Sequence, residues 1–164
     1  MPSQAVTAVA AVAAVASAGI GGVFYGFSTF VMRGLDRTEP AEAITAMRGI
    51  NAEAQANAPF LALFMGSALL AVAVGVAAVL RWDHTGSAWL FAGAVLGVVG
   101  FAVTVAFNVP LNNHLDALAP QSLSAADAAR EWRDYLSAWT AWNHVRTVSG
   151  FAAAALMVTG LLKR

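Results

Sequence analysis

The sequence predicts an all-α, integral membrane four-helix bundle with two long loops that carry short amphipathic helices on one side. Composition is the first reason: 59% of the 164 residues are hydrophobic and only 11% are charged, whereas soluble domains carry about 25% charged residues. The second reason is four apolar stretches, each long enough as a helix to cross about 30 Å of hydrocarbon. We expect one membrane domain over residues 1–164, with spans near 5–31, 59–80, 88–109 and 143–162.

Composition also excludes several classes of protein. The nine basic and nine acidic side chains balance, so no excess of positive charge indicates a nucleic-acid partner. Cysteine is absent, which excludes disulfides, thiolate metal sites and a cysteine nucleophile. Residues 16–18 have the small-x-small form of a signal cleavage site, but no basic residue precedes them. We therefore expect the first apolar stretch to be a retained membrane helix.

The first span carries glycines at helical spacing, Gly19, Gly22 and Gly26. Gly22 and Gly26 form a GxxxG pair, and small residues at this spacing let a neighbouring helix approach closely. The pattern favours packing within the bundle, and the same Gly-rich faces could pair two copies of the chain.

The loop at 32–58 contains a predicted amphipathic helix. Pro40 fits the first turn of a helix, and Ile44, Met47 and Ile50 follow with the spacing of one helix face. Such a helix could lie in the membrane interface. Polar amides then come just before the second span, at Asn51, Gln55 and Asn57.

A short turn at 81–87 joins the second span to the third, where Gly93, Gly97 and Gly100 indicate a second closely packed face. Pro110 should disrupt the helix near the exit of this span. In the loop at 110–138, Ser124 resembles a helix cap. The helix that starts there should continue into the fourth span.

The four spans place both termini and the 81–87 turn on one side of the membrane and both long loops on the other. Polar stretches from distant parts of the chain therefore converge on one surface. The number of basic residues on the long-loop side favours cytoplasmic loops. Basic residues directly at the span ends on the opposite side, Arg81, Lys163 and Arg164, instead favour cytoplasmic termini. We expect a bacterial inner-membrane protein in this orientation.

The candidate site lies at the membrane edge, in residues 107–114 and 139–146. Polar groups at this depth are costly unless they pair with each other or with a ligand. An aromatic stripe leads into the last span at spacings of three and four residues, and a few polar groups converging on apolar walls are typical of a ligand pocket. The alternative is an ordinary interfacial belt, with an arginine reaching for lipid headgroups. The stripe comprises Trp132, Tyr135, Trp139, Trp142 and Arg146.

His144 is the candidate general base, because imidazole titrates near neutral pH. A metal site that joins it to His114 and Asp116 is an alternative, but no metal-binding motif supports it. We therefore assign no metal ligand.

At these residues the chain resembles the anthrone oxygenase family of small four-span membrane proteins. The resemblance covers nearly the whole chain and rests on residues 22–32, 46–51, 108–112 and 139–147. The runs Asn-Val-Pro-Leu-Asn and Trp-Asn-His-Val-Arg are specific in combination, whereas Arg33 stands where many relatives have proline. The resemblance implies oxidation of a polycyclic anthrone to an anthraquinone by O2, with no cofactor.

Under that hypothesis His144 removes a proton from the substrate, and a set of polar side chains stabilises the resulting oxyanion. The set comprises Arg146, Asn108, Asn112 and Asn143. The ligand-binding residues would be Tyr25, Asn51, Trp139 and Trp142. The expected partners are the lipid bilayer and a small aromatic or quinone-like ligand. The rival hypothesis is a non-enzymatic membrane protein whose polar cluster is structural, or binds lipid or a partner subunit.

Overall fold

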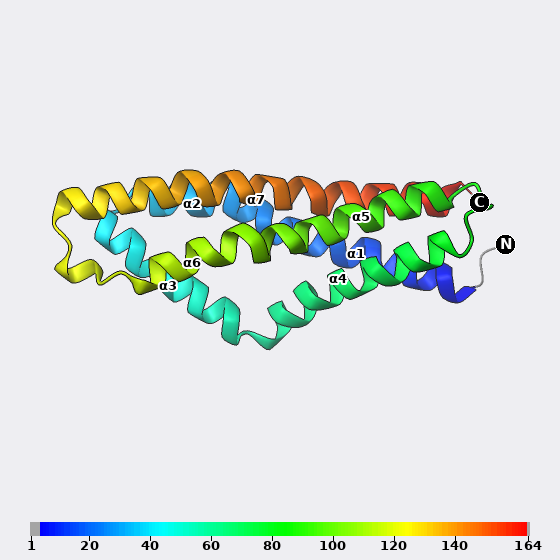
Figure 1. Ribbon diagram of the computed structural model, residues 1–164, viewed down its shortest axis with the longest axis horizontal. Coiled ribbons are helices and arrows are strands. Elements are labelled where there is room, and N and C mark those ends of the chain that lie inside the picture. Colours follow the sequence, from blue (N-terminus) through cyan, green and yellow to red (C-terminus); the bar gives the residue numbers. More distant parts are fainter. Residues whose placement is uncertain (1–3, 164) are drawn as a thin grey trace.

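The computed structural model describes residues 4–163, and every regular element in this range is helical, which confirms the predicted fold class (Figure 1). Four continuous helical stretches are long and apolar enough to cross a membrane, so the chain is an integral membrane protein. The elements are α1 (Gln4–Gly26), η1 (Phe27–Val31), α2 (Met32–Leu35), α3 (Pro40–Ala56), α4 (Ala58–Val79), α5 (Ser87–Val103), η2 (Thr104–Asn108), α6 (Val109–Ala117), η3 (Pro120–Ser122) and α7 (Ala125–Leu162).

The start of α1, the end of α7 and the α4–α5 turn lie at one end of the elongated bundle (Figure 1). The other end holds α3, α6 and the first part of α7. Helix α7 runs for 38 residues without interruption, from the loop region into the fourth span. The loop segments therefore pack on a helical extension of the bundle itself.

The buried side of α3 faces protein. Ile44 and Met47 are fully buried, in a cluster with Trp132, Tyr135 and Trp139 of α7. The amphipathic pattern predicted that this apolar face lies in the membrane interface. In the structure this face instead packs on the extension of α7, where it covers the aromatic stripe.

The extension of α7 begins with a side-chain cap. The Ser124 hydroxyl accepts a hydrogen bond from the Asp127 backbone N–H at 3.1 Å and donates one to the Asp127 carboxylate at 2.7 Å. These contacts satisfy a backbone donor that the helix leaves open at its start. The Ser124 hydroxyl and the Arg130 guanidinium also hold the pKa of Asp127 below its usual value. The cap fixes where the long helix starts.

Pro110 does not end the third span but widens the turn before it. Proline lacks an N–H, and its ring crowds the carbonyl four residues earlier. The turn at Thr104–Asn108 is π-helical, and the Val109 N–H donates to the Thr104 carbonyl. The helix then continues as α6. The wider turn leaves Asn108 fully buried against α7.

Glycines bring α1 and α7 into backbone contact, but not at the predicted position. A Cβ added at Gly150 would lie 2.8 Å from the Gly21 Cα and 3.1 Å from the Ser17 carbonyl oxygen. Gly22, of the predicted GxxxG pair, has nothing within 4 Å. The close approach falls one residue earlier, at Gly21, because the helix is rotated by about 100° from the expected face. In the third span, Gly93 and Gly97 do pack closely on neighbouring helices.

We expect Gly150→Ala to destabilise the bundle and Gly22→Ala to leave it unchanged or slightly more stable. The new methyl at position 150 meets backbone atoms that cannot rotate away, and such overpacking costs about 1–3 kcal/mol. At position 22 the methyl meets open space, and alanine has the higher helix propensity. Thermal unfolding of both variants in one detergent measures the difference. Equal stability of the two would contradict this packing.

Candidate functional site

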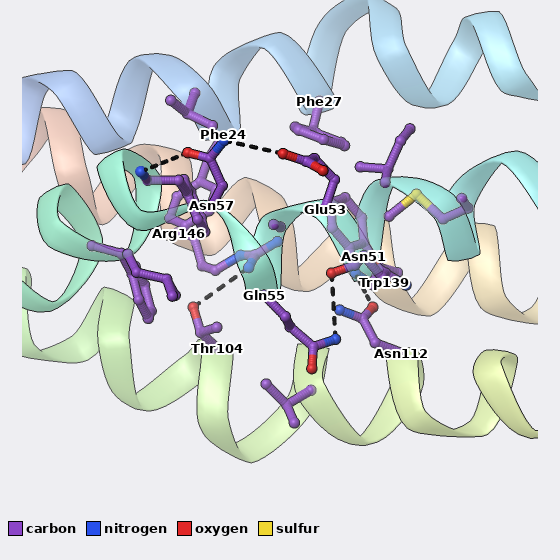
Figure 2. A pocket seen from close by; sticks show the side chains of 18 of the residues that line it. Phe24, Phe27, Asn51, Glu53, Gln55, Asn57, Thr104, Asn112, Trp139 and Arg146 are labelled. Carbon is purple, nitrogen blue, oxygen red and sulfur yellow. Dashed lines mark hydrogen bonds between the residues drawn. The ribbon is translucent and has the colours of Figure 1, made fainter.

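A cavity of about 740 Å³ lies at the loop end of the bundle, between α3 and the ends of the spans (Figure 2). Its walls come from α1, η1, α3, α4, η2, α6 and α7. Aromatic rings make up much of the apolar wall, and polar groups are interspersed among them, as is typical of ligand sites. The aromatic residues are Phe24, Phe27, Phe60, Phe64 and Trp139; the polar ones are Asn51, Glu53, Gln55, Asn57, Thr104, Asn112, Asn113 and Arg146.

Arg146 is a buried cation on the cavity wall, with only 4% of its surface exposed. One guanidinium nitrogen donates to the Asn143 side-chain oxygen at 2.7 Å and another reaches the Thr104 hydroxyl at 3.4 Å. The guanidinium carbon lies 4.1 Å from the ring centre of Phe24 and 4.9 Å from that of Trp139.

The charge of Arg146 has no partner of opposite sign. Within residues 4–163 no carboxylate forms an ion pair with it, and its Nε lacks a hydrogen-bond acceptor. A buried charge is costly unless it is paired. The cavity beside the guanidinium is therefore the place where an anionic group of a ligand would lower that cost.

Two further amides border the cavity. The Asn112 oxygen accepts hydrogen bonds from the Tyr135 hydroxyl at 2.9 Å and the Trp139 indole N–H at 2.8 Å. Both aromatic residues are thus fixed to α6. The side chain of Asn51 is buried, and its amide nitrogen has no hydrogen-bond partner in the structure. Asn51 thus contributes to the cavity wall, whereas this nitrogen is itself shielded from the cavity.

Asn108 and Asn143 lie behind this wall and do not line the cavity. Both are fully buried. Asn108 donates to the Trp139 carbonyl at 3.2 Å, and Asn143 donates to the Phe24 carbonyl at 2.7 Å while it accepts from Arg146. They hold the backbone around Trp139 and the guanidinium of Arg146 in place.

Three other predicted site residues lie outside the cavity. His144 is exposed, and its Nδ1 lies 2.9 Å from the Ser28 hydroxyl in a separate groove. Tyr25 is 53% exposed and packs edge-on against Phe151. Trp142 stacks on Phe107, with 3.6 Å between ring centres. The structure thus brings four predicted residues to the cavity: Asn51, Asn112, Trp139 and Arg146.

The histidines and acids considered for a metal are dispersed. His114 lies 2.8 Å from the Glu131 carboxylate, and Asp116 lies 3.9 Å from Arg48. In the part of the chain that the structure describes, no group of three His, Asp or Glu side chains could hold a metal ion.

Glu53 is a cavity residue that the sequence analysis did not single out. Its carboxylate accepts a hydrogen bond from the Asn57 amide at 3.2 Å, and it forms no ion pair with Arg146 (Figure 2). Asn57 in turn caps α4, since its side-chain oxygen accepts from the Phe60 N–H at 3.0 Å. Its position in the sequence could have indicated a role at the site, because Glu53 is the acid nearest the start of the second span and lies one helical turn before the capping residue.

Four membrane-crossing helices and a cavity with an unpaired cation at one end define the class of protein: an integral membrane helical bundle. The chain belongs to the anthrone oxygenase family, whose sequence model matches residues 53–156, more than half of its length. The matched range includes Glu53, Asn112, Trp139 and Arg146. Residues 22–32 and 46–51, which also resemble the family, precede this range. The searches of curated proteins and of solved structures found no match.

Proposed function

We propose that the protein binds a flat, hydrophobic aromatic ligand with an ionisable oxygen, such as an anthrone, in the cavity and oxidises it with O2 without a cofactor. The observation that carries this proposal is Arg146, a buried cation without a carboxylate partner on the wall of an aromatic-lined cavity. Family membership supports the substrate class.

The chemistry needs a base and a stabilised oxyanion. Removal of a proton from the CH2 group of an anthrone gives an aromatic enolate, whose oxygen would lie beside Arg146. The enolate transfers an electron to O2, and the two resulting radicals combine at the former CH2 carbon to form a hydroperoxide. Loss of water then leaves the quinone carbonyl. One oxygen atom of O2 enters the product and the other leaves as water, so no external reductant is consumed.

Glu53 is the base that this geometry favours. It is the carboxylate on the cavity wall, Asn57 orients it, and Arg146 does not neutralise it. His144, the base chosen from the sequence, would have to act from its own groove through Ser28 and Asn143, which are linked to it by hydrogen bonds. His144 remains the alternative assignment.

The test uses purified protein supplied with an anthrone and O2, with quinone formation followed by absorbance. Binding of an anthraquinone, which cannot be oxidised further, is measured in parallel by quenching of tryptophan fluorescence. We expect both binding and turnover, and we expect His144→Gln to turn over like the wild type. Binding of the anthraquinone without oxidation of the anthrone would show that the protein binds the ligand but is not an oxygenase. Loss of both would favour the rival hypothesis of a structural or lipid-binding cluster.

The orientation in the membrane belongs to the same proposal. We place the termini in the cytoplasm of a bacterial cell, on the basis of the basic residues at the span ends, and the cavity at the opposite surface. Because the chain has no cysteine, single Thr85→Cys and Thr45→Cys variants report the two sides separately. A membrane-impermeant thiol reagent added to intact spheroplasts should label only Thr45→Cys.

A further inference from the structure

We infer that the ligand reaches the cavity sideways, from the hydrocarbon core of the membrane, through a gap rimmed by Met65, Val105 and Val109. This inference rests on the proposed function, because it concerns the route to the same cavity. It also defines the ligand further, as a compound that dissolves in the bilayer and keeps its polar end at the surface.

The depth of the rim follows from helix lengths. Helix α4 has 22 residues and is about 33 Å long, close to the thickness of the hydrocarbon core. Met65 lies seven residues after Ala58, about 10 Å inside the membrane boundary on the loop side. Counted from Ser87 at the opposite boundary, Val105 is about 27 Å along the third span. Both side chains are therefore at the depth of acyl chains.

The rim residues are exposed and also line the cavity. Met65 is 43% exposed, Val105 53% and Val109 41%, yet all three belong to the cavity wall. A side chain that is exposed on the outer surface and also lines the cavity lies at an opening of the cavity. In a membrane, an apolar opening at this depth faces lipid, and the hydrocarbon core contains no water that would have to be excluded from it.

The cavity continues past the membrane boundary into a polar part. Glu53 and Gln55 of α3 and Asn113 of α6 line it there, and these three residues are exposed. The cavity thus has an apolar end within the hydrocarbon and a polar end at the surface. A planar aromatic compound with polar substituents at one edge takes the same orientation in a bilayer, so it could move sideways into the cavity without turning over.

The path of the chain explains why the gap exists. Helix α4 diverges from α5 toward the α3–α4 joint (Figure 1). At the joint, Asn57 has an extended backbone (φ −81°, ψ 99°) and caps the next helix. The π-helical turn η2 and α6 continue on the other side of the gap. The two walls are therefore separated at the level where Arg146 borders the cavity.

The test measures how fast a ligand binds to protein in phosphatidylcholine nanodiscs. The probe is 1-hydroxyanthraquinone, mixed in from protein-free vesicles, and tryptophan quenching is followed by stopped flow. We expect the double variant Met65→Phe/Val105→Phe to lower the association rate constant at least tenfold. Leu69→Phe is the matched control: it lies one turn further on the same face of α4, is 71% exposed and does not line the cavity. It should bind at the wild-type rate.

The outcomes separate the route from the function. An association rate that the double variant leaves unchanged, or that falls equally in Leu69→Phe, overturns the sideways route. The same holds if Asn113→Phe, at the polar end, slows binding while the double variant does not, because the ligand would then arrive from water. If the wild type does not bind the probe at all, the proposed function fails and the route fails with it.

Discussion

Replacement of Arg146 by Met is expected to abolish ligand binding and anthrone oxidation while leaving the stability of the protein close to that of the wild type. Removal of one donor to a developing oxyanion typically costs about 10²–10³-fold in rate. The guanidinium also supplies the positive charge on the cavity wall, so we expect kcat/KM to fall by at least about 10²-fold. The assay with an anthrone and O2 measures the rate, and tryptophan quenching by an anthraquinone measures binding.

Stability should respond differently because Arg146 is expensive to bury. A buried arginine without an opposite charge is costly, and the hydrogen bonds to Asn143 and Thr104 offset much of that cost. Met fills the space without that cost, so the melting temperature should change little. A structural role predicts the reverse: a loss of about 3–5 kcal/mol, as for a broken buried network, with no ligand effect. Unfolding of Arg146→Met at lower temperature would thus support the rival hypothesis.

The membrane fold could be predicted from the sequence because hydropathy alone defines the spans. The convergence of polar segments at one end then followed from connectivity. The rotation of each helix about its own axis could not be predicted. Gly21 rather than Gly22 meets α7, and the apolar side of α3 packs against α7. Each depends on which face of a helix finds a partner, and adjacent faces of these apolar helices have nearly the same composition.

The same limit applies to the site. The stripe predicted on α7 included Trp142, but the buried face runs through Trp139, Asn143 and Arg146. His144 is one residue beyond Asn143, about 100° around the helix, so it faces a different groove. Arg146 could be found because it is a charged residue at a position where burial is costly. Burial of a charge without an opposite charge, beside a cavity, is the feature that indicates a ligand.

Glu53→Gln is expected to lower the rate of anthrone oxidation about 10²–10⁴-fold, the usual contribution of a general base, without weakening the binding of an anthraquinone. Gln keeps the length and shape of the side chain and can still accept from Asn57, so the cavity wall should stay intact. It cannot take a proton from the substrate. The effect should therefore appear in kcat, whereas Arg146→Met should also remove binding. A loss of kcat without a loss of binding distinguishes a general base from a residue that shapes the cavity.

Glu42→Gln is the matched control, since Glu42 lies on the same helix, is exposed and does not border the cavity. It should turn over like the wild type. If Glu53→Gln also keeps the full rate while His144→Gln loses it, the base is His144 and the proton leaves through Ser28 toward the second groove. If neither substitution slows oxidation, neither Glu53 nor His144 is the base, and the assignment of a base to either side chain is wrong. The comparison of Glu53→Gln with His144→Gln thus decides whether the proton leaves at the cavity or at the second groove.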